Sequence, residues 1–186
     1  MNLLEVKKKI LRIVEEINPS SEATDANIAT DVDLAEKLND VINEILFELC
    51  RIKKIPAKDE FEVTQGQEIN LQEDLDNFYQ LNIIKGVRYE QIDDTIIFAE
   101  DGTAKIFYYK FPKRIKKETD AEKYKFECTD DVIECLIFGV CADILKSDVS
   151  NNYGQIYANR YAELKQGLDP RYARASIVVD DDGLDI

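Results

Sequence analysis

Side chains that commonly carry out acid–base or nucleophilic chemistry are scarce in this sequence. It contains no histidine, so the commonest general base and the usual catalytic triads are missing. The phosphate-binding motifs G-x-x-x-x-G-K-[ST] and G-x-G-x-x-G are missing as well. Two pairs of neighbouring acids, Asp93–Asp94 and Asp130–Asp131, could act as paired carboxylates or magnesium ligands, but their positions favour turn and helix-cap roles. We therefore expect no catalytic residue and no enzyme.

The cysteines and the acidic C-terminal residues are the remaining candidates for metal binding. No C-x-x-C spacing joins the four cysteines, and no histidine is present to complete a zinc site with them. The final "DDDGLD" resembles part of a calcium-binding loop but lacks the glutamate of its twelfth position. We expect no metal ion, no cofactor, and thiols that are buried in a reducing cytoplasm. The cysteines are Cys50, Cys128, Cys135 and Cys141.

One basic run stands out because the whole chain has a net charge of −14. The stretch "KIFYYKFPKRIKK", residues 105–117, reads as a strand followed by a loop that carries five positive charges and no acid. This run could be a solvated loop, a contact for an acidic protein, or a local contact with DNA. Its candidate contact residues are Lys110, Lys113, Arg114, Lys116 and Lys117.

Four aromatic side chains lie within or beside the strand that precedes the basic loop. Since successive residues of a strand point to opposite faces, we expect at least half of these rings to lie in the core. That expectation argues against a platform on which single-stranded nucleic acid would stack. The four residues are Phe107, Tyr108, Tyr109 and Phe111.

Apolar residues at helical spacing predict four helices in two groups. The first group has a helix over residues 2–17 and a longer one that Asp33 caps and that ends before Pro56. The second group has a helix that begins at Asp131 and is apolar nearly all round, and a tyrosine-rich helix that starts at Asn151–Asn152 and ends at Gly167. We expect the third of these four helices to lie at the centre of a bundle.

Between the two helical groups the pattern changes to that of strands. Residues 60–126 are rich in β-branched and aromatic residues and are broken by turn signals. The clearest signal is Asp101–Gly102, which predicts a hairpin between "TIIFA" and "AKIFYYKF". Pro112 should end the second strand of that hairpin, because proline lacks the N–H that a strand ladder uses.

The predicted fold class is therefore α+β: a bundle of about four helices with an inserted antiparallel β-rich subdomain and an extended C-terminal tail. Residues 1–168 form a single domain, with helical parts 1–54 and 129–168 and the β-rich insert 60–126. The tail, 169–186, has too few apolar residues to fold alone. Its residues Ile177, Val178 and Val179 could add a strand to a neighbour's sheet.

The order of these elements resembles that of the head–tail connector (adaptor) proteins of tailed bacteriophages. The likeness rests on three stretches that cover nearly the whole chain in this order. A long helix closes with a basic turn and a proline, a strand exits through a "Y-K-x-P" type sequence, and a tyrosine-rich helix follows. The three stretches are "AEKLNDVINEILFELCRIKKIP", "YYKFPKRI" and "IYANRYAELK". The β-rich insert is larger here than in the all-helical adaptors.

The resemblance implies a structural virion protein at the head–tail junction, made in the cytoplasm of a bacterial host. Such a protein forms a ring of about twelve copies below the portal and binds the portal protein and the next neck or tail protein. DNA passes through the ring without sequence-specific binding, and an acidic lumen would keep the DNA from sticking. In this setting the basic run is interpreted as a contact with protein rather than with nucleic acid.

Two other classes of function remain open from the sequence. One is a non-catalytic helical module that binds other proteins. The other is a nucleic-acid regulator, because "DVDLAEKLNDVINEIL" faintly resembles the opening of a helix-turn-helix. Residues 18–48 contain eight acids and one base, Lys37, which would repel phosphates. The longest apolar run, "CLIFGVCA", is far too short to cross a membrane, so no membrane partner is expected.

Overall fold

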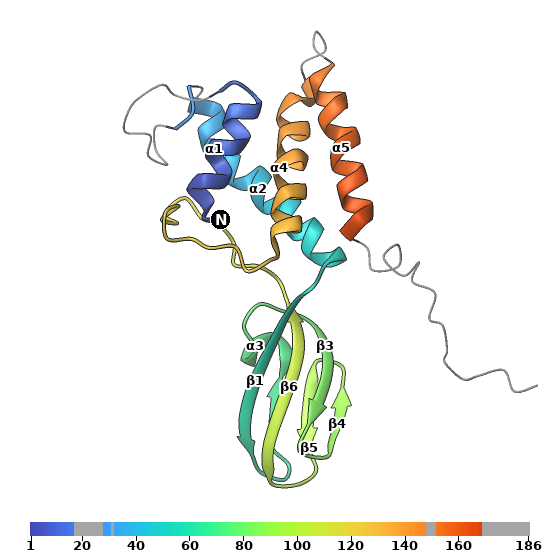
Figure 1. Ribbon diagram of the computed structural model, residues 1–186. Helices are drawn as coiled ribbons and strands as arrows, with labels where there is room; N and C mark the ends of the chain where they lie inside the picture. The colour runs from blue at the N-terminus through green and yellow to red at the C-terminus, as the bar shows by residue number, and fades with distance from the viewer. Residues whose placement is uncertain (17–27, 31, 148–151, 169–186) are drawn as a thin grey trace, which may run out of the picture.

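The computed structural model describes residues 1–16, 28–30, 32–147 and 152–168, and these residues form a helical part and a β-sandwich (Figure 1). The helices of the helical part come from both sides of the strands in the sequence. The helical part contains α1 (Leu3–Ile13), α2 (Val32–Ile52), α4 (Asp130–Ile144), the 3₁₀ turn η1 (Leu145–Ser147) and α5 (Tyr153–Leu168).

Helix α4 is the centre of the helical part, since α1, α2 and α5 all pack against it. Its sequence is apolar nearly all round, and Cys135, Leu136 and Val140 are completely buried. Gly139 permits this close packing: a Cβ atom at that position would lie 2.8 Å from Cε2 of Tyr161 on α5 and 2.9 Å from Cγ2 of Ile45 on α2. A glycine inside a helix destabilises it by about 1 kcal/mol relative to alanine, so the tight contact accounts for its presence.

The predicted bundle of about four helices with one β-rich insert is wrong. The part of the chain that the structure describes contains five α-helices and two three-stranded sheets. Helices α1, α4 and α5 stand side by side, but α2 crosses them obliquely (Figure 1). The fifth helix, α3 (Leu71–Asp74), is a single turn within the β-sandwich that the side chain of Asn70 caps. Apolar spacing reveals which face of a helix is buried, but it does not determine the angle at which two helices cross.

The boundaries of α1 and α2 differ from the prediction. Helix α1 starts with a capping box between Asn2 and Glu5, as its polar start suggests. It ends at Ile13, and Glu15 then adopts a left-handed backbone conformation with φ of 61°. Helix α2 already begins at Val32, so Asp33 lies in its first turn rather than at the cap. A carboxylate in the first turn still interacts favourably with the helix dipole.

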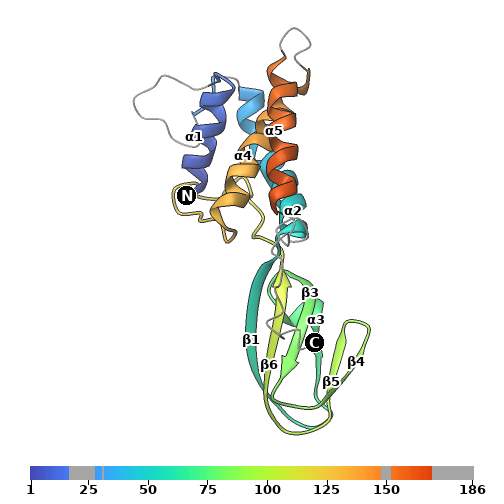
Figure 2. The same cartoon turned by 45° about the vertical axis from the view of Figure 1, so that its right-hand side comes forward.

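The strands pair into two antiparallel sheets that face each other (Figure 2). One sheet has the order β1-β6-β3, and the other has the order β2-β5-β4. Buried side chains from both sheets, such as Ile106 from the first and Ile96 and Phe98 from the second, form a core of their own between the layers. The strands are β1 (Ile55–Val63), β2 (Glu68–Asn70), β3 (Phe78–Lys85), β4 (Tyr89–Ile92), β5 (Thr95–Phe98) and β6 (Gly102–Lys110).

The hairpin predicted at Asp101–Gly102 is wrong, because the two strands that it joins belong to different sheets. The turn carries the chain across the sandwich from β5 to β6. The hairpin of this region lies between β4 and β5, where Asp93–Asp94 forms a two-residue turn and Asp93 has a φ of 52°. Asx residues tolerate this left-handed conformation, which explains the turn role of the acidic pair. Strand β6 ends at Lys110, two residues before Pro112.

The aromatic rings of the β6 region are also not distributed as predicted. Only Tyr108 belongs to the buried core of the sandwich, where its hydroxyl donates a 2.8 Å hydrogen bond to Asp59. Phe107 and Tyr109 lie on the opposite, outer face of the sheet and are half-buried. Phe111 continues this row beyond the end of the strand and is also half-buried. The alternation of the strand therefore gathers three rings on the outer side rather than in the core.

Candidate functional site

The basic run lies on a segment that the protein holds firmly against α2. We call residues 110–117 the basic strap. Within it, Pro112 and Ile115 are buried, and Ile115 belongs to the core of the helical part. The buried side chain of Asn43 on α2 donates a hydrogen bond of 2.7 Å to the carbonyl of Ile115 and accepts one of 2.8 Å from its N–H. The amide therefore pairs with the strap as a neighbouring strand would.

This anchor determines which charges of the strap face outward. Lys113, Arg114, Lys116 and Lys117 are exposed on both sides of the buried Ile115. Two further bonds fix the backbone between them: the hydroxyl of Tyr124 donates to the carbonyl of Lys113 at 2.6 Å, and the N–H of Lys116 donates to Oγ1 of Thr119 at 2.9 Å. Four cations are thus presented from an ordered backbone.

The fifth predicted contact residue, Lys110, has a different role. Its ammonium group lies 2.8 Å from the carboxylate of Glu127, and its side chain is only 16% exposed. The ion pair ties the end of β6 to the segment that leads into α4. The structure thus brings four of the five basic candidates together on the surface and places Lys110 inside an internal contact. The other predicted contacts, Ile177, Val178 and Val179, lie outside the described residues.

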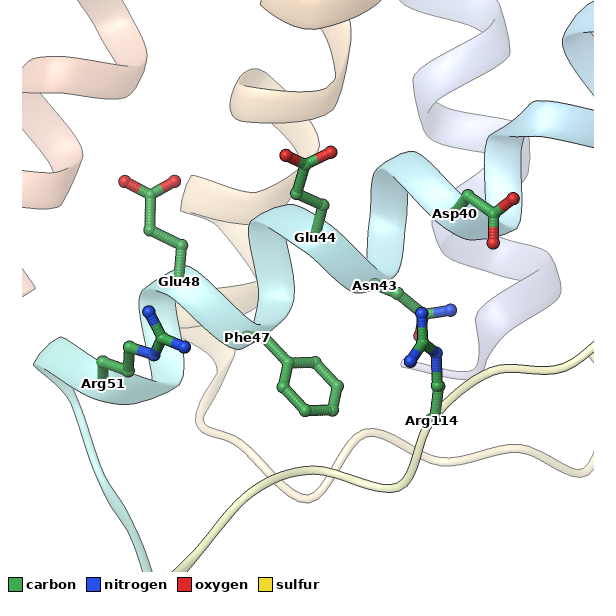
Figure 3. Close-up of a pocket in the computed structure, with 7 residues that line it drawn as sticks. All are labelled: Asp40, Asn43, Glu44, Phe47, Glu48, Arg51 and Arg114. Carbon is green, nitrogen blue, oxygen red and sulfur yellow. The ribbon is translucent and has the colours of Figure 1, made fainter. Parts of the chain in front are cut away.

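A groove of about 670 Å³ runs along α2 beside the strap. Three carboxylates line it at intervals of four residues, Asp40, Glu44 and Glu48, which is the spacing of one helix face. Arg51 on α2 and Arg114 on the strap supply guanidinium groups (Figure 3). The remaining lining residues are Phe47, whose ring points toward the strap in Figure 3, and the anchoring Asn43.

Glu48 connects the groove to α5. It accepts a 2.9 Å hydrogen bond from the hydroxyl of Tyr161 and forms an ion pair with Lys165. Partial burial raises the pKa of Glu48, but the hydrogen bonds from Lys165 and Tyr161 outweigh burial and hold the pKa below its usual value. Burial and the hydrogen bond to Glu48 together raise the pKa of Tyr161. Glu48 is therefore an anion at neutral pH.

Aromatic rings connect the groove to the β-sandwich. Phe47 stacks on Phe111 with ring centroids 5.3 Å apart. The ring of Tyr79 on β3 also contacts Phe111, with its centroid 4.6 Å from that of Phe111. The guanidinium carbon of Arg51 lies 5.9 Å from the centroid of Phe111. Rings at these distances attract one another and attract cations. We call Phe47, Phe111 and Tyr79 the aromatic junction, because they join the helical part to the sandwich.

The thiols have the environment of core residues. Cys50, Cys135 and Cys141 are buried and Cys128 is half-buried, and all four are free. Burial raises the pKa of Cys50 and Cys141 to about 12, so both are neutral thiols at physiological pH. Within the described ranges, no group of three or more acidic or cysteine side chains could hold a metal ion. No helix among these residues is long and apolar enough to span a membrane.

The groove and the outer face of the sandwich were not predicted from the sequence. The interval of four residues between the carboxylates of α2 was a signal for the groove, since it places them on one helix face. For the outer face, the signal was the alternation Lys105, Phe107, Tyr109 along one strand. Neither signal identifies which other segments of the chain lie beside these side chains. No protein-family model matches this chain, and no curated protein has significant sequence similarity to it.

Proposed function

We propose that this protein is a head–tail connector of a tailed bacteriophage. In this role it forms a ring below the portal, joins the capsid to the tail and lets DNA pass through its lumen. The observation that carries the proposal is the arrangement of the two parts. Helices from both sides of the strand region form one body, and a β-sandwich projects from it through the adjacent strands β1 and β6. That order is the one on which the resemblance to connectors rests.

The basic strap and the groove support a role in protein contacts. The strap holds four exposed cations on a backbone that is hydrogen-bonded to α2, and the groove beside it presents three carboxylates. Complementary charges across an interface accelerate association and select the correct partner. Because the backbone of the strap is already ordered, little conformational entropy is lost when a partner binds. Such a surface suits a contact with a neighbouring subunit or the portal.

The charge of the molecule supports passage of DNA without tight binding. With a net charge of −14, the chain repels phosphates except near local basic patches. Helix α2 runs without interruption from Val32 to Ile52, and its exposed acids include Asp40 and Glu44. A helix with such an acidic face would repel the phosphates of DNA if it entered the major groove of the duplex. These features favour a ring through which DNA passes and disfavour a regulator that binds DNA tightly.

Sedimentation with portal rings tests this proposal. The purified chain should co-sediment with portal rings from the same virus, and the variant with Lys113, Arg114, Lys116 and Lys117 changed to Gln should co-sediment less, most clearly at low salt. Exposed charges act over about 10 Å at 0.1 M salt and contribute little to folding. The matched control removes four exposed cations elsewhere: Lys9, Lys37, Lys123 and Lys125 to Gln.

Three results would contradict parts of the proposal, two from this experiment and one from a binding assay with DNA duplexes. A chain that does not bind portal rings at any salt concentration contradicts the connector function. Binding to a DNA duplex with sequence preference supports a regulator instead. If the two quadruple variants bind portal rings equally well, the strap is a solvated surface and the contact lies elsewhere.

A further inference from the structure

The outer face of sheet β1-β6-β3 combines an aromatic centre with lysines. Phe107 lies in the middle strand, and the ammonium nitrogens of Lys58 and Lys85 lie 5.6 Å and 5.7 Å from its ring centroid. Lys105 is exposed two residues before Phe107 on the same face. Ile83, the cross-strand partner of Phe107, is 43% exposed. We call this surface the basic face.

The outer face of sheet β2-β5-β4 has the opposite charge and a similar layout. Ile97 in its middle strand pairs with Glu68 on one side and Glu90 on the other, and directly paired residues share a face. Both glutamates are exposed, and Ile97 is half-buried. Ile92, which lies beside them on β4, is 52% exposed. We call this surface the acidic face.

Some charges on both faces have no acidic or basic partner in the part of the chain that the structure describes. Lys85 lies directly opposite Lys105 across β3 and β6, and like charges at such positions destabilise a sheet. On its other side Lys105 lies directly opposite Glu60 of β1, and its charge helps to lower the pKa of that carboxyl. Among the described residues, Lys85, Glu68 and Glu90 are in no ion pair. Lys58 is paired with Glu60 on its own strand. Glu60 offsets part of the repulsion between Lys85 and Lys105, and an acidic partner over Lys85 would relieve the rest.

We propose that the basic face of one copy binds the acidic face of the next copy. The two faces complement each other in charge, and each has a partly exposed apolar centre flanked by its charges. They lie on opposite sides of the sandwich, because the core of the sandwich separates the two sheets. A contact between two different faces is heterologous, and such contacts close into a ring or continue into a filament. The inference adds a specific surface to the ring assembly proposed above and depends on that proposal only for closure of the ring.

The small area of the acidic face limits how strongly the two faces can bind each other. The strands of the acidic face are three or four residues long, so the face measures about 14 Å by 13 Å. A stable pair of proteins buries about 800 Å² on each partner. The sandwich contact therefore orients neighbouring copies in an assembly that other surfaces also hold. Its loss should weaken the assembly without abolishing every contact.

Charge reversal on one face at a time tests the inference. Lys58→Glu with Lys85→Glu makes both faces acidic, and Glu68→Lys with Glu90→Lys makes both faces basic. Each double variant alone should self-associate at least about tenfold more weakly than the original chain, as measured by analytical ultracentrifugation. An equimolar mixture of the two should recover association, because acidic and basic faces can alternate. The chain with all four substitutions should also self-associate, because its formerly basic face is then acidic and its formerly acidic face is basic. Far-ultraviolet circular dichroism checks that each variant is folded.

Cross-linking provides a second test that leaves all charges in place. Chains with Ile83→Cys and chains with Ile92→Cys should form mixed disulfides when combined, and far fewer when either is oxidised alone. Cys128, the half-buried natural thiol, is changed to Ser in both chains, and the buried Cys50, Cys135 and Cys141 contribute little background.

The outcomes separate this inference from the connector function. An original chain that stays monomeric at its highest soluble concentration, or variants that associate as strongly as it does, overturns the pairing of the two faces. If that happens while the chain still binds portal rings, the connector function stands. If association is lost and recovered as described but the chain does not bind portal rings, the pairing of the two faces is supported and the connector function is contradicted.

Discussion

The core of the helical part takes side chains from Leu3 to Leu168, whereas the buried side chains of the β-sandwich core come from residues 63–108, with Ala57 and Phe61 packed against them. Segments distant in sequence must therefore meet before the helical core is complete: α1, α2, the basic strap, α4 and the end of α5. The sandwich needs only neighbouring strands. The aromatic junction is where the two parts meet. This difference indicates that the two parts respond separately to a local defect.

The largest effect should follow the loss of a side chain at the centre of the helical part. Leu136 is completely buried in α4, so Leu136→Ala should lower the free energy of unfolding by about 2–5 kcal/mol. Hydrogen exchange should rise in α1, α2, α4 and α5 and stay low in β1 and β6. Ile96→Ala, the matched change in the sandwich core, should give the reverse pattern. Equal increases in both parts after either substitution would contradict the separation of the two cores.

The anchor of the basic strap should give the next largest effect. Asn43→Ala leaves the N–H and the carbonyl of Ile115 without partners in a buried place, which should lower stability by about 2–4 kcal/mol. Trypsin should then cut more rapidly at Arg114 and Lys116. The control is Asn39→Ala, since among the described residues the side chain of Asn39 makes a single long contact, of 3.5 Å, with the carbonyl of Lys116. Similar cleavage rates in both variants would show that the amide of Asn43 does not hold the strap.

Two glycines in the helical part should respond with opposite signs to the same substitution. Gly139→Ala forces a methyl group against Tyr161 and Ile45, so it should lower stability by about 1–3 kcal/mol. Gly167→Ala on α5 meets nothing within 4 Å, so it should raise stability by up to about 1 kcal/mol. Urea unfolding of the two variants measures both changes. A gain in stability at Gly139 would mean that α2 and α5 do not approach α4 as closely as described.

The smallest effect concerns the ion pair between Glu48 and Lys165. Lys165→Gln should lower stability by less than about 1 kcal/mol at neutral pH, because the pair is partly exposed. The folded protein holds the pKa of Glu48 below the ordinary value of 4.5, so this contribution is present above pH 4.5 and is lost as the pH falls further. Thermal unfolding of the original chain and the variant should therefore converge in acid. A difference in stability that persists at low pH would exclude Glu48 as the cause.

The sequence predicted the parts of the fold that depend on local patterns. Apolar spacing located the four long helices. The errors concern relations between elements. Asp101–Gly102 is a strong hairpin signal, but the same turn chemistry also serves a crossing between two sheets. The side on which Phe107 lies is decided by the register of β6 against its neighbours, which local alternation alone does not specify.

For the candidate site, composition predicted a cationic segment but not its support. The link between Asn43 and Ile115 spans 72 residues, and an asparagine inside an amphipathic helix has no local feature that indicates such a partner. The groove depends on the same link, because the strap carries Arg114 to α2. The pairing of charged faces on the sandwich could be inferred only after the strand order was known.

Native mass spectrometry of the chain mixed with portal rings tests the central claim most directly. A connector should form a complex in which one portal ring carries a fixed and complete set of copies of this chain, with no stable intermediate numbers at saturation. The variant with both Lys58→Glu and Lys85→Glu should bind the portal but fill the ring less cooperatively. A chain that remains monomeric beside intact portal rings, at every ratio and salt concentration, would contradict the account.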